Sequence, residues 1–202
     1  MPNFTTDWFT TKQHYFEKYL LPFKGIKGLN FLEVGSYEGR SAIWCLDNVL
    51  TDKDSYIVCV YSFKGSPEHK GLNANTEKIF DVFMENVKPY GNQVQVFPNE
   101  SYLVLRSLPL RAFDFIYIDG SHKASDVLED ATACWRLLKK GAMMAFDDHF
   151  WTFHSNRYGE NTKVEEDKLL EEPLIAIDSF LKVFKNQYKL LESGDQVWIE
   201  KL

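Results

Sequence analysis

L-N-F-L-E-V-G-S-Y-E-G-R-S-A, residues 29–42, is the stretch that decides the fold. Residues 29–34 form a short apolar run that predicts a strand, and residues 40–50 predict a helix. Between them, Gly35 allows a sharp turn without a Cβ clash, and Gly39 allows close approach of a ligand or of the next helix. A strand, a glycine loop and a helix in this order are typical of open α/β sheets, whose ligands bind beyond the carboxyl ends of the strands.

The rest of the chain alternates strands with helices. We expect strands at residues 56–61, 94–97, 113–118 and 142–146, and helices at residues 7–21, 73–87, 101–108, 122–138 and 173–185. Two last strands, residues 188–191 and 196–200, flank a Ser-Gly-Asp turn that is typical of an antiparallel hairpin. The pattern predicts a Rossmann-like, doubly wound α/β fold: a mostly parallel sheet with a C-terminal antiparallel hairpin and helices on both faces.

The length of 202 residues suits one domain with a real core. We divide it into an N-terminal helical extension (1–28), a cofactor-binding core (29–148), an aromatic and charged loop (149–172), and a C-terminal helix and hairpin (173–202). No internal repeat or second domain is expected.

Composition excludes several classes of protein. The net charge of −6 argues against a nucleic-acid partner, whose phosphates require basic residues. No apolar run approaches the ~18 residues of a membrane span, and the N-terminus lacks the pattern of a signal peptide. The three cysteines are far apart and lie among apolar neighbours, which indicates buried thiols in a reducing cytoplasm. We therefore expect a cytoplasmic protein that binds a small-molecule substrate and no membrane; a homodimer is left open.

The glycine loop differs from a dinucleotide-binding loop. A pyrophosphate site requires Gly-x-Gly-x-x-Gly, whereas this loop reads Glu-x-Gly-x-x-x-Gly, with Glu33 on the strand itself. A carboxylate at that position suits a positively charged ligand without phosphate, such as the amino group of a methionine. The alternative is that Gly35 and Gly39 only shape the turn and that Glu33 is a surface carboxylate. Taken alone, the loop fits both interpretations equally.

Three motifs, in order and in register, carry a resemblance to a known family. They are F-L-E-V-G-S-Y-E-G-R-S-A at residues 31–42, F-D-F-I-Y-I-D-G-S-H at 113–122, and L-L-K-K-G-A-M-M-A-F-D-D-H at 137–149. The chain resembles the small class I methyltransferases that use S-adenosylmethionine. It is most similar to those related to the metal-dependent catechol and caffeoyl-CoA O-methyltransferases and to the antibiotic-sugar O-methyltransferases. The resemblance implies O-methylation of a small hydroxylated molecule, with S-adenosylmethionine as cofactor and Mg²⁺ as a second one.

The resemblance also implies which residues contact the cofactor: Glu33, Gly35, Ser36, Gly39, Tyr61, Ser101 and Asp119. Relatives usually carry an acid at the end of the second strand, which accepts hydrogen bonds from both ribose hydroxyls. Tyr61 stands at that position here, and Glu68 is an alternative ribose partner. This departure supports a rival interpretation, a binding or regulatory protein of the same fold with weak or no catalysis. An NAD-dependent enzyme is disfavoured because Gly-x-Gly-x-x-Gly is missing.

Three carboxylates end neighbouring strands of the predicted sheet. Asp119 follows the fourth strand, and Asp147 and Asp148 follow the fifth. Because neighbouring strands lie about 5 Å apart, these groups should converge and repel one another unless they share a proton or a cation. Hard oxygen ligands favour Mg²⁺, or Mn²⁺ as a substitute, and the resemblance implies the same metal site. The less favoured alternative is that Asp147 caps a loop, Asp148 faces solvent and no metal is used.

His122 lies three residues after Asp119, where the resembling enzymes carry a lysine that assists proton removal. A histidine titrates near pH ~6.5, which suits a general base, so Asp119 and His122 are the expected catalytic residues. Equally, His122 caps the helix or packs under the cofactor. His149 is a second candidate base by position alone.

Rings are concentrated after the proposed metal site. Residues 149–154 read H-F-W-T-F-H, which favours an aromatic wall around a planar or sugar substrate, to which Trp8 and Phe9 contribute. The alternative is that these rings dock the loop on the core or on a second subunit.

Overall fold

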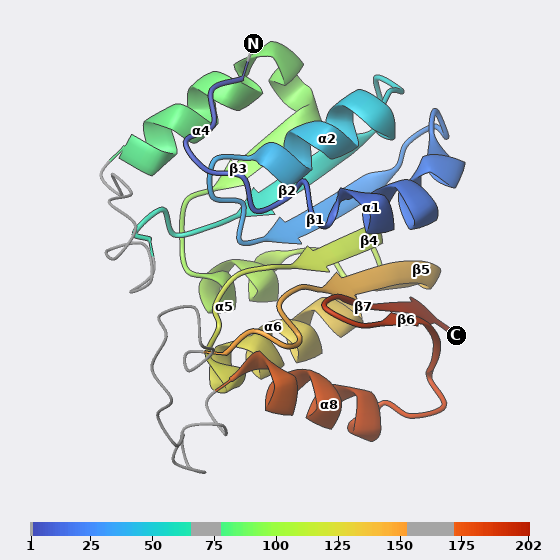
Figure 1. Cartoon of the computed structure of the whole chain (residues 1–202). Coiled ribbons are helices and arrows are strands. Elements are labelled where there is room, and N and C mark those ends of the chain that lie inside the picture. The colour runs from blue at the N-terminus through green and yellow to red at the C-terminus, as the bar shows by residue number, and fades with distance from the viewer. Residues whose placement is uncertain (1, 66–77, 153–171) are drawn as a thin grey trace. The chain divides into compact units, whose positions relative to one another are not determined.

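The computed structural model describes residues 2–65, 78–152 and 172–202 (Figure 1). These residues form two compact units, Met1–Val104 and Leu105–Leu202. Glu68, the first part of the helix predicted at 73–87, Phe153 and His154 lie outside the described residues. No described helix has both the length and the apolar character that crossing a bilayer requires.

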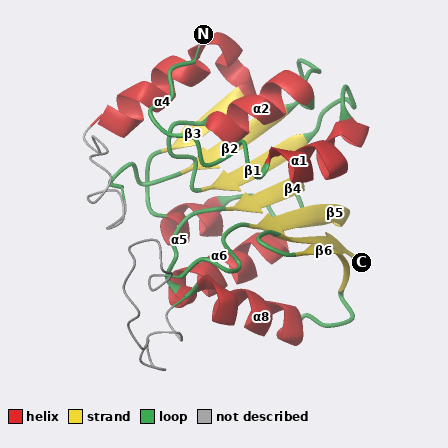
Figure 2. Cartoon of the chain, in the orientation of Figure 1, coloured by secondary structure: helices red, strands yellow, loops and turns green. Residues whose placement is uncertain are grey.

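The first unit contains three parallel strands. They are β1 (Asn30–Val34), β2 (Tyr56–Val60) and β3 (Val94–Phe97), in the order β3-β2-β1. Leu32 pairs with Val58, and Ile57 pairs with Val94. Strands β1 and β2 are almost entirely buried, as expected of apolar runs in a parallel sheet that is covered on both faces. Figure 2 shows these strands as adjacent yellow arrows.

Helices of the first unit pack through aromatic side chains. They are α1 (Gln13–Leu20), α2 (Arg40–Asn48), α4 (Ile79–Val87) and α5 (Ser101–Val104). Phe16 of α1 meets Trp44 of α2 edge-on at 5.7 Å between ring centroids. Phe83 of α4 is fully buried and lies against Gly39, the residue that precedes α2. The start of α2 is therefore fixed by a neighbouring helix as well as by the loop before it.

The second unit contains four strands, two of which form the predicted hairpin. They are β4 (Phe113–Ile118), β5 (Leu138–Phe146), β6 (Tyr188–Ser193) and β7 (Val197–Lys201), in the order β4-β5-β7-β6. β4 and β5 are parallel, whereas β5 with β7 and β7 with β6 are antiparallel. The predicted α/β class, mostly parallel with a C-terminal antiparallel hairpin, is confirmed.

Two helices, α6 (Ala124–Leu137) and α8 (Pro173–Val183), lie side by side in the second unit (Figure 1). Phe180 of α8 joins them to the sheet, because its ring lies 5.6 Å from Trp135 of α6 and 5.4 Å from Phe146 of β5. Rings that pack edge to face in this range stabilise a core beyond their buried area.

Two predicted boundaries are wrong. The helix expected from residue 7 begins only at Gln13, and residues 8–12 before it form bends and turns in which Asp7 accepts hydrogen bonds from the backbone N–H and the hydroxyl of Thr10.

The second boundary lies between α6 and β5. Lys139, Lys140 and Gly141 resemble the end of a helix, but α6 already ends at Leu137 and these residues belong to β5. The pairing of β5 with β4 shifts there, so the extra residues form a bulge, and Gly141 has a φ of +78°. Lys139 Nζ bonds both carboxylate oxygens of Asp114 on β4 at 2.8 Å. This partner, 25 residues away in the chain, favours the strand over the local helix-ending signal.

Gly39→Ala should destabilise the protein more than Gly28→Ala. Both glycines have a left-handed φ, +85° and +67°, which costs an L residue about 1–2 kcal/mol. At Gly39 the new Cβ would also lie 3.1 Å from the Phe83 ring, which adds about 1–3 kcal/mol of overpacking. A Cβ at Gly28 would have no described atom within 4 Å apart from those of Gly28 and its two chain neighbours. Urea denaturation of both variants measures the difference, and equal losses would show that Phe83 moves aside freely.

Candidate active site

The loop after β1 has a backbone that few side chains tolerate. Gly35, Tyr37 and Gly39 have positive φ angles of +97°, +43° and +85°. Gly35 N–H donates to Val60 O at 2.9 Å, and Gly39 N–H donates to Ser36 O at 2.7 Å. The loop therefore forms a tight arch that ends on the N-terminus of α2. Backbone N–H groups at such a helix end lack partners within the helix and are available to a ligand.

Glu33 lies beneath this loop, not on the surface. Its side chain is 2% exposed, so the alternative of a surface carboxylate is wrong. The Ser41 hydroxyl donates to one of its carboxylate oxygens, and the Cys59 thiol donates to the other at 3.9 Å. Burial raises the pKa of Glu33 above its usual value. Glu33 thus supports the strand, the loop and α2 from inside the first unit.

The N-terminal segment is fastened to the same loop by Glu38 and Arg40. The carboxylate of Glu38 accepts hydrogen bonds from the Thr5 backbone N–H at 2.7 Å and from the Thr5 hydroxyl at 2.6 Å. Arg40 donates to the carbonyl oxygen of Thr6 at 2.9 Å, and its guanidinium lies 4.2 Å from the centre of the Phe4 ring. We call residues 3–8 the N-terminal strap. It covers the loop that the sequence assigns to the cofactor.

Trp8 and Phe9, both expected in an aromatic wall, have different surroundings. The Trp8 ring is 47% exposed and lies 5.0 Å from the ring of Tyr37 in the glycine loop. Phe9 is 8% exposed and packs against Phe16, so it belongs to the core, and its expected place in a substrate wall is wrong.

The remaining cofactor candidates of the first unit, Tyr61 and Ser101, are half-buried. Tyr61 directly follows β2, and its ring lies 5.0 Å from the ring of Phe63. Ser101 is the first residue of α5. Both are accessible enough to meet a ligand.

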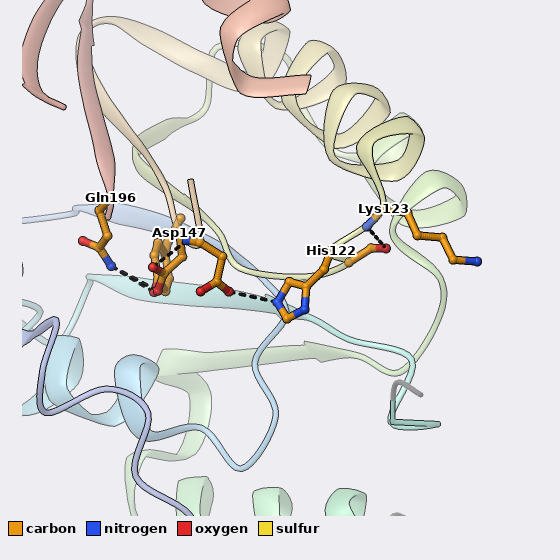
Figure 3. A network of polar contacts seen from close by, with 7 residues as sticks. His122, Lys123, Asp147 and Gln196 are labelled. Carbon is orange, nitrogen blue, oxygen red and sulfur yellow. Dashed lines mark hydrogen bonds and ion pairs between the residues drawn. The ribbon is translucent and has the colours of Figure 1, made fainter. Parts of the chain in front are cut away.

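In the second unit, the structure brings Asp119, His122 and Asp148 together. One possible ligand atom from each lies within 4.8 Å of the other two. His122 Nε2 is 2.9 Å from Asp148 Oδ2, an interaction drawn in Figure 3. The ring of Trp151 lies 4.2 Å from the imidazole. All four side chains are half-buried, so they form a defined site that a ligand can reach. The shallow pocket at this point is lined by Ile118, Asp119, Gly120, Ser121, His122, Val127, Phe146, Asp147, Asp148 and Pro173.

Asp147 is not part of that group of three. Its Oδ1 accepts a hydrogen bond from the backbone N–H of Asp148 at 2.8 Å. Its Oδ2 accepts from the hydroxyl of Tyr117 and from the side-chain amide of Gln196, the latter at 3.1 Å (Figure 3). Burial raises the pKa of Tyr117 well above its usual value, and the nearby carboxylates of Asp119 and Asp147 add to this shift. Tyr117 therefore remains a proton donor to Asp147 at neutral pH.

His149, the second candidate base, is occupied elsewhere. It is 5% exposed, and its Nδ1 and Nε2 lie 3.2 Å from Gly194 O and 3.0 Å from Asp178 Oδ1. These contacts fasten the turn after β5 to the hairpin and to α8. Phe150 is 59% exposed, and its ring lies 4.6 Å from the His149 ring in a tilted arrangement, so of the described rings in this loop only Trp151 contacts the group of three.

Comparison with known proteins identifies the family. Residues 32–149 match the model of a methyltransferase domain. The chain belongs to this methyltransferase family.

Other methyltransferases share its fold at low sequence identity. The O-methyltransferase TomG from Streptomyces achromogenes, solved in complex with S-adenosylmethionine, is 13% identical with a TM-score of 0.63, over 100% of this chain and 83% of that one. An O-methyltransferase from Bacillus cereus in complex with S-adenosylhomocysteine is 18% identical with a TM-score of 0.61, over 98% and 84% of the two chains.

The uncharacterized protein R132 of Acanthamoeba polyphaga mimivirus is 26% identical over 123 residues, which are 60% of this chain. The match spans about half (52%) of the length of that relative.

Sequence reasoning missed several residues that support the candidate functional residues of each unit. Tyr117 carries one available signal, a phenol inside an apolar strand two residues before Asp119, which must find a polar partner when buried. Gln196 and the clamp between Thr5 and Glu38 carry no local signal, because their partners are distant in the chain.

Glu38→Gln should loosen the N-terminal strap. A glutamine has an NH₂ donor in place of one of the two carboxylate oxygens that accept from Thr5, and it lacks the negative charge. A hydrogen bond to a charged group contributes about 1.5 kcal/mol or more, which corresponds to about tenfold faster exchange of the Thr5 amide hydrogen. Hydrogen exchange followed by NMR measures this rate. Glu17→Gln is the matched control, since Glu17 is exposed and accepts a hydrogen bond from Gln13, one turn earlier on the same helix. Unchanged protection of Thr5 in Glu38→Gln would contradict the clamp.

Proposed function

We propose that this methyltransferase domain transfers the methyl group of S-adenosylmethionine to a hydroxyl of a small molecule, with assistance from a divalent metal. The observation that carries the proposal is the group formed by Asp119, His122 and Asp148, whose donor atoms lie within 4.8 Å of one another. In this proposal, the first unit binds the cofactor and the second unit activates the substrate.

The glycine loop fits an S-adenosyl ligand. Gly35 and Gly39 adopt left-handed φ angles that residues with a Cβ rarely adopt, and the arch that they form ends at the N-terminus of α2. In this proposal Gly35, Ser36 and Gly39 bind the methionine part through the backbone, and Glu33 supports them from beneath. Solved structures of TomG and of the Bacillus cereus enzyme contain S-adenosylmethionine and S-adenosylhomocysteine, which supports the same cofactor here.

Two carboxylates and an imidazole form a suitable donor set for a divalent cation. Carboxylate oxygens favour Mg²⁺, while an imidazole nitrogen makes Mn²⁺ at least as suitable. A bound cation would supply the positive charge that lowers the pKa of a substrate hydroxyl. Asp119 and Asp148 would hold it. Asp147, expected from the sequence as the third carboxylate ligand, has both oxygens bonded to protein donors, so we assign it to supporting Asp148.

His122 is well placed to accept the substrate proton. The Trp151 ring, 4.2 Å away, holds the imidazole from one side, and Asp148 holds it through Nε2. A carboxylate bonded to an imidazole fixes the ring and stabilises the imidazolium that forms when a proton is taken up.

A second candidate function is favoured by one observation. Tyr61 stands where an acid would accept both ribose hydroxyls, and a phenol has only one oxygen to offer. Under this candidate the chain binds the cofactor and regulates a partner without turnover. Ligand binding with no methyl transfer to any acceptor would favour it.

S-adenosylhomocysteine should raise the thermal unfolding midpoint, whereas NAD should not. A ligand that binds only the native state stabilises it by about 2.7 kcal/mol at a concentration one hundred times Kd. Differential scanning fluorimetry and calorimetric titration measure both ligands on the same sample. If millimolar S-adenosylhomocysteine leaves the midpoint unchanged, the cofactor assignment fails.

Asp148→Asn should reduce methyl transfer by at least about tenfold while S-adenosylhomocysteine binding stays unchanged, because the loss falls on substrate activation. Transfer of a radiolabelled methyl group to a panel of catechols and hydroxylated sugars, with Mg²⁺, Mn²⁺ or EDTA, measures this effect. Asp126→Asn is the matched control, since Asp126 is an exposed acid of the same unit outside the group. Full activity in EDTA would place the chain among metal-independent methyltransferases.

A further inference from the structure

The position of the Asp148 carboxylate depends on an uncommon backbone conformation. Asp148 has a φ of +57°, a left-handed value that L residues adopt rarely and that surrounding contacts must maintain. The residue lies two positions after the end of β5, where the chain turns. Because its Oδ2 lies 2.9 Å from His122 Nε2, whatever holds this turn also sets the geometry of the group of three.

Asp147 holds the turn. Its own backbone N–H donates to Ile118 O at 3.0 Å, which anchors it to the end of β4. Its Oδ1 then accepts the N–H of Asp148 at 2.8 Å. The direction of that N–H follows from the left-handed φ, so the Asp147 carboxylate must be held still if the turn is to persist.

Two buried donors hold the other oxygen of Asp147 (Figure 3). The Tyr117 hydroxyl and the Gln196 amide both donate to Oδ2, and these two residues are 3% and 0% exposed. The orientation of Gln196 is determined by Trp198, whose indole N–H can only donate and bonds Gln196 Oε1 at 2.8 Å. Gln196 therefore presents its NH₂ group, and not its oxygen, to Asp147. Trp198 is itself immobilised, stacked on Phe115 with the ring planes 13° apart.

From these contacts we propose that Tyr117 and Gln196 are positioning residues of the methyltransferase site. They hold the Asp147 carboxylate, which fixes the Asp148 turn and thereby the separation of Asp148 from His122. The effect on metal binding rests on the function proposed above, whereas the effect on the Asp148 turn does not. Apolar side chains at these positions would stabilise the core at a lower desolvation cost, because each buried polar group must keep its hydrogen-bond partner.

Tyr117→Phe tests the proposal by removing one donor while keeping the ring. Mn²⁺ is the probe, and its free concentration is read by electron paramagnetic resonance during a titration of the full chain. The dissociation constant of Mn²⁺ should rise about tenfold, as is typical when a partner of a metal ligand is lost. In parallel, NMR should show a shifted Asp148 amide resonance and faster exchange of its hydrogen. Tyr188→Phe is the matched control, because it loses a hydroxyl bond to Leu181 O in the same unit but outside this network.

Gln196→Glu is the second variant, and it keeps the side-chain shape. It places an acceptor opposite the Asp147 carboxylate in place of a donor, so it should shift the Asp148 amide at least as much as Tyr117→Phe does. If Tyr117→Phe and Gln196→Glu both leave the Asp148 amide and the Mn²⁺ affinity as they are in Tyr188→Phe, the proposal is overturned. If the unaltered protein binds no Mn²⁺, the metal part of the proposed function fails, and the Asp148 amide alone decides the positioning role.

Discussion

In each unit, the candidate functional residues depend on left-handed backbone just beyond the end of a buried strand. Gly35 follows β1 with a φ of +97°, and Asp148 follows β5 with a φ of +57°. The side chains of a strand in a covered parallel sheet are buried, so a ligand meets the first residues beyond the strand. A left-handed residue turns the chain abruptly enough to keep those residues at the carboxyl end of the strand. Glycine adopts this backbone freely, but aspartate needs contacts that hold it there.

In each unit, a carboxylate beneath the turn supports the turn. Glu33 lies beneath the glycine loop and accepts bonds from Ser41 and Cys59, and Asp147 lies beneath the Asp148 turn. Burying a carboxylate is costly unless donors surround it, and donors to a charged group form stronger hydrogen bonds than donors to a neutral one. Each carboxylate therefore fixes several backbone and side-chain groups at once. The groups that these carboxylates hold lie beneath each turn, so the groups above each turn remain available for ligands.

Local patterns predicted the strands of this fold because they are short runs rich in apolar and β-branched residues between turn residues. β3 and β4 begin and end at the predicted residues, 94–97 and 113–118. The bulge in β5 was not predictable, because Lys139 is committed to a strand by Asp114, which no local rule relates to it. In the same way, the sequence predicted correctly that Asp147 and Asp148 follow β5, but it did not predict which of the two lies beside Asp119. Both oxygens of Asp147 accept hydrogen bonds from protein donors, whereas Asp148, with its left-handed φ, joins Asp119. Identifying Asp148 as that residue required the positions of Tyr117 and Gln196.

The histidine at position 122 changes what the site can do, compared with the lysine expected from the resemblance. A lysine in water remains protonated at neutral pH, so it must be perturbed or helped by a metal before it can accept a proton, whereas an imidazole gives up its proton close to neutrality. Nε2 of His122 faces Asp148 Oδ2 at 2.9 Å, and a single nitrogen cannot donate to a carboxylate and coordinate a cation at the same time. A cation held by Asp119 and Asp148 would therefore either displace the hydrogen bond or leave His122 outside its coordination shell. In the first case His122 would be a ligand, and in the second it would be left to act as the proposed base. The separation of Asp148 from His122 determines which of these occurs, which is why the buried network beneath Asp148 matters to the chemistry above it.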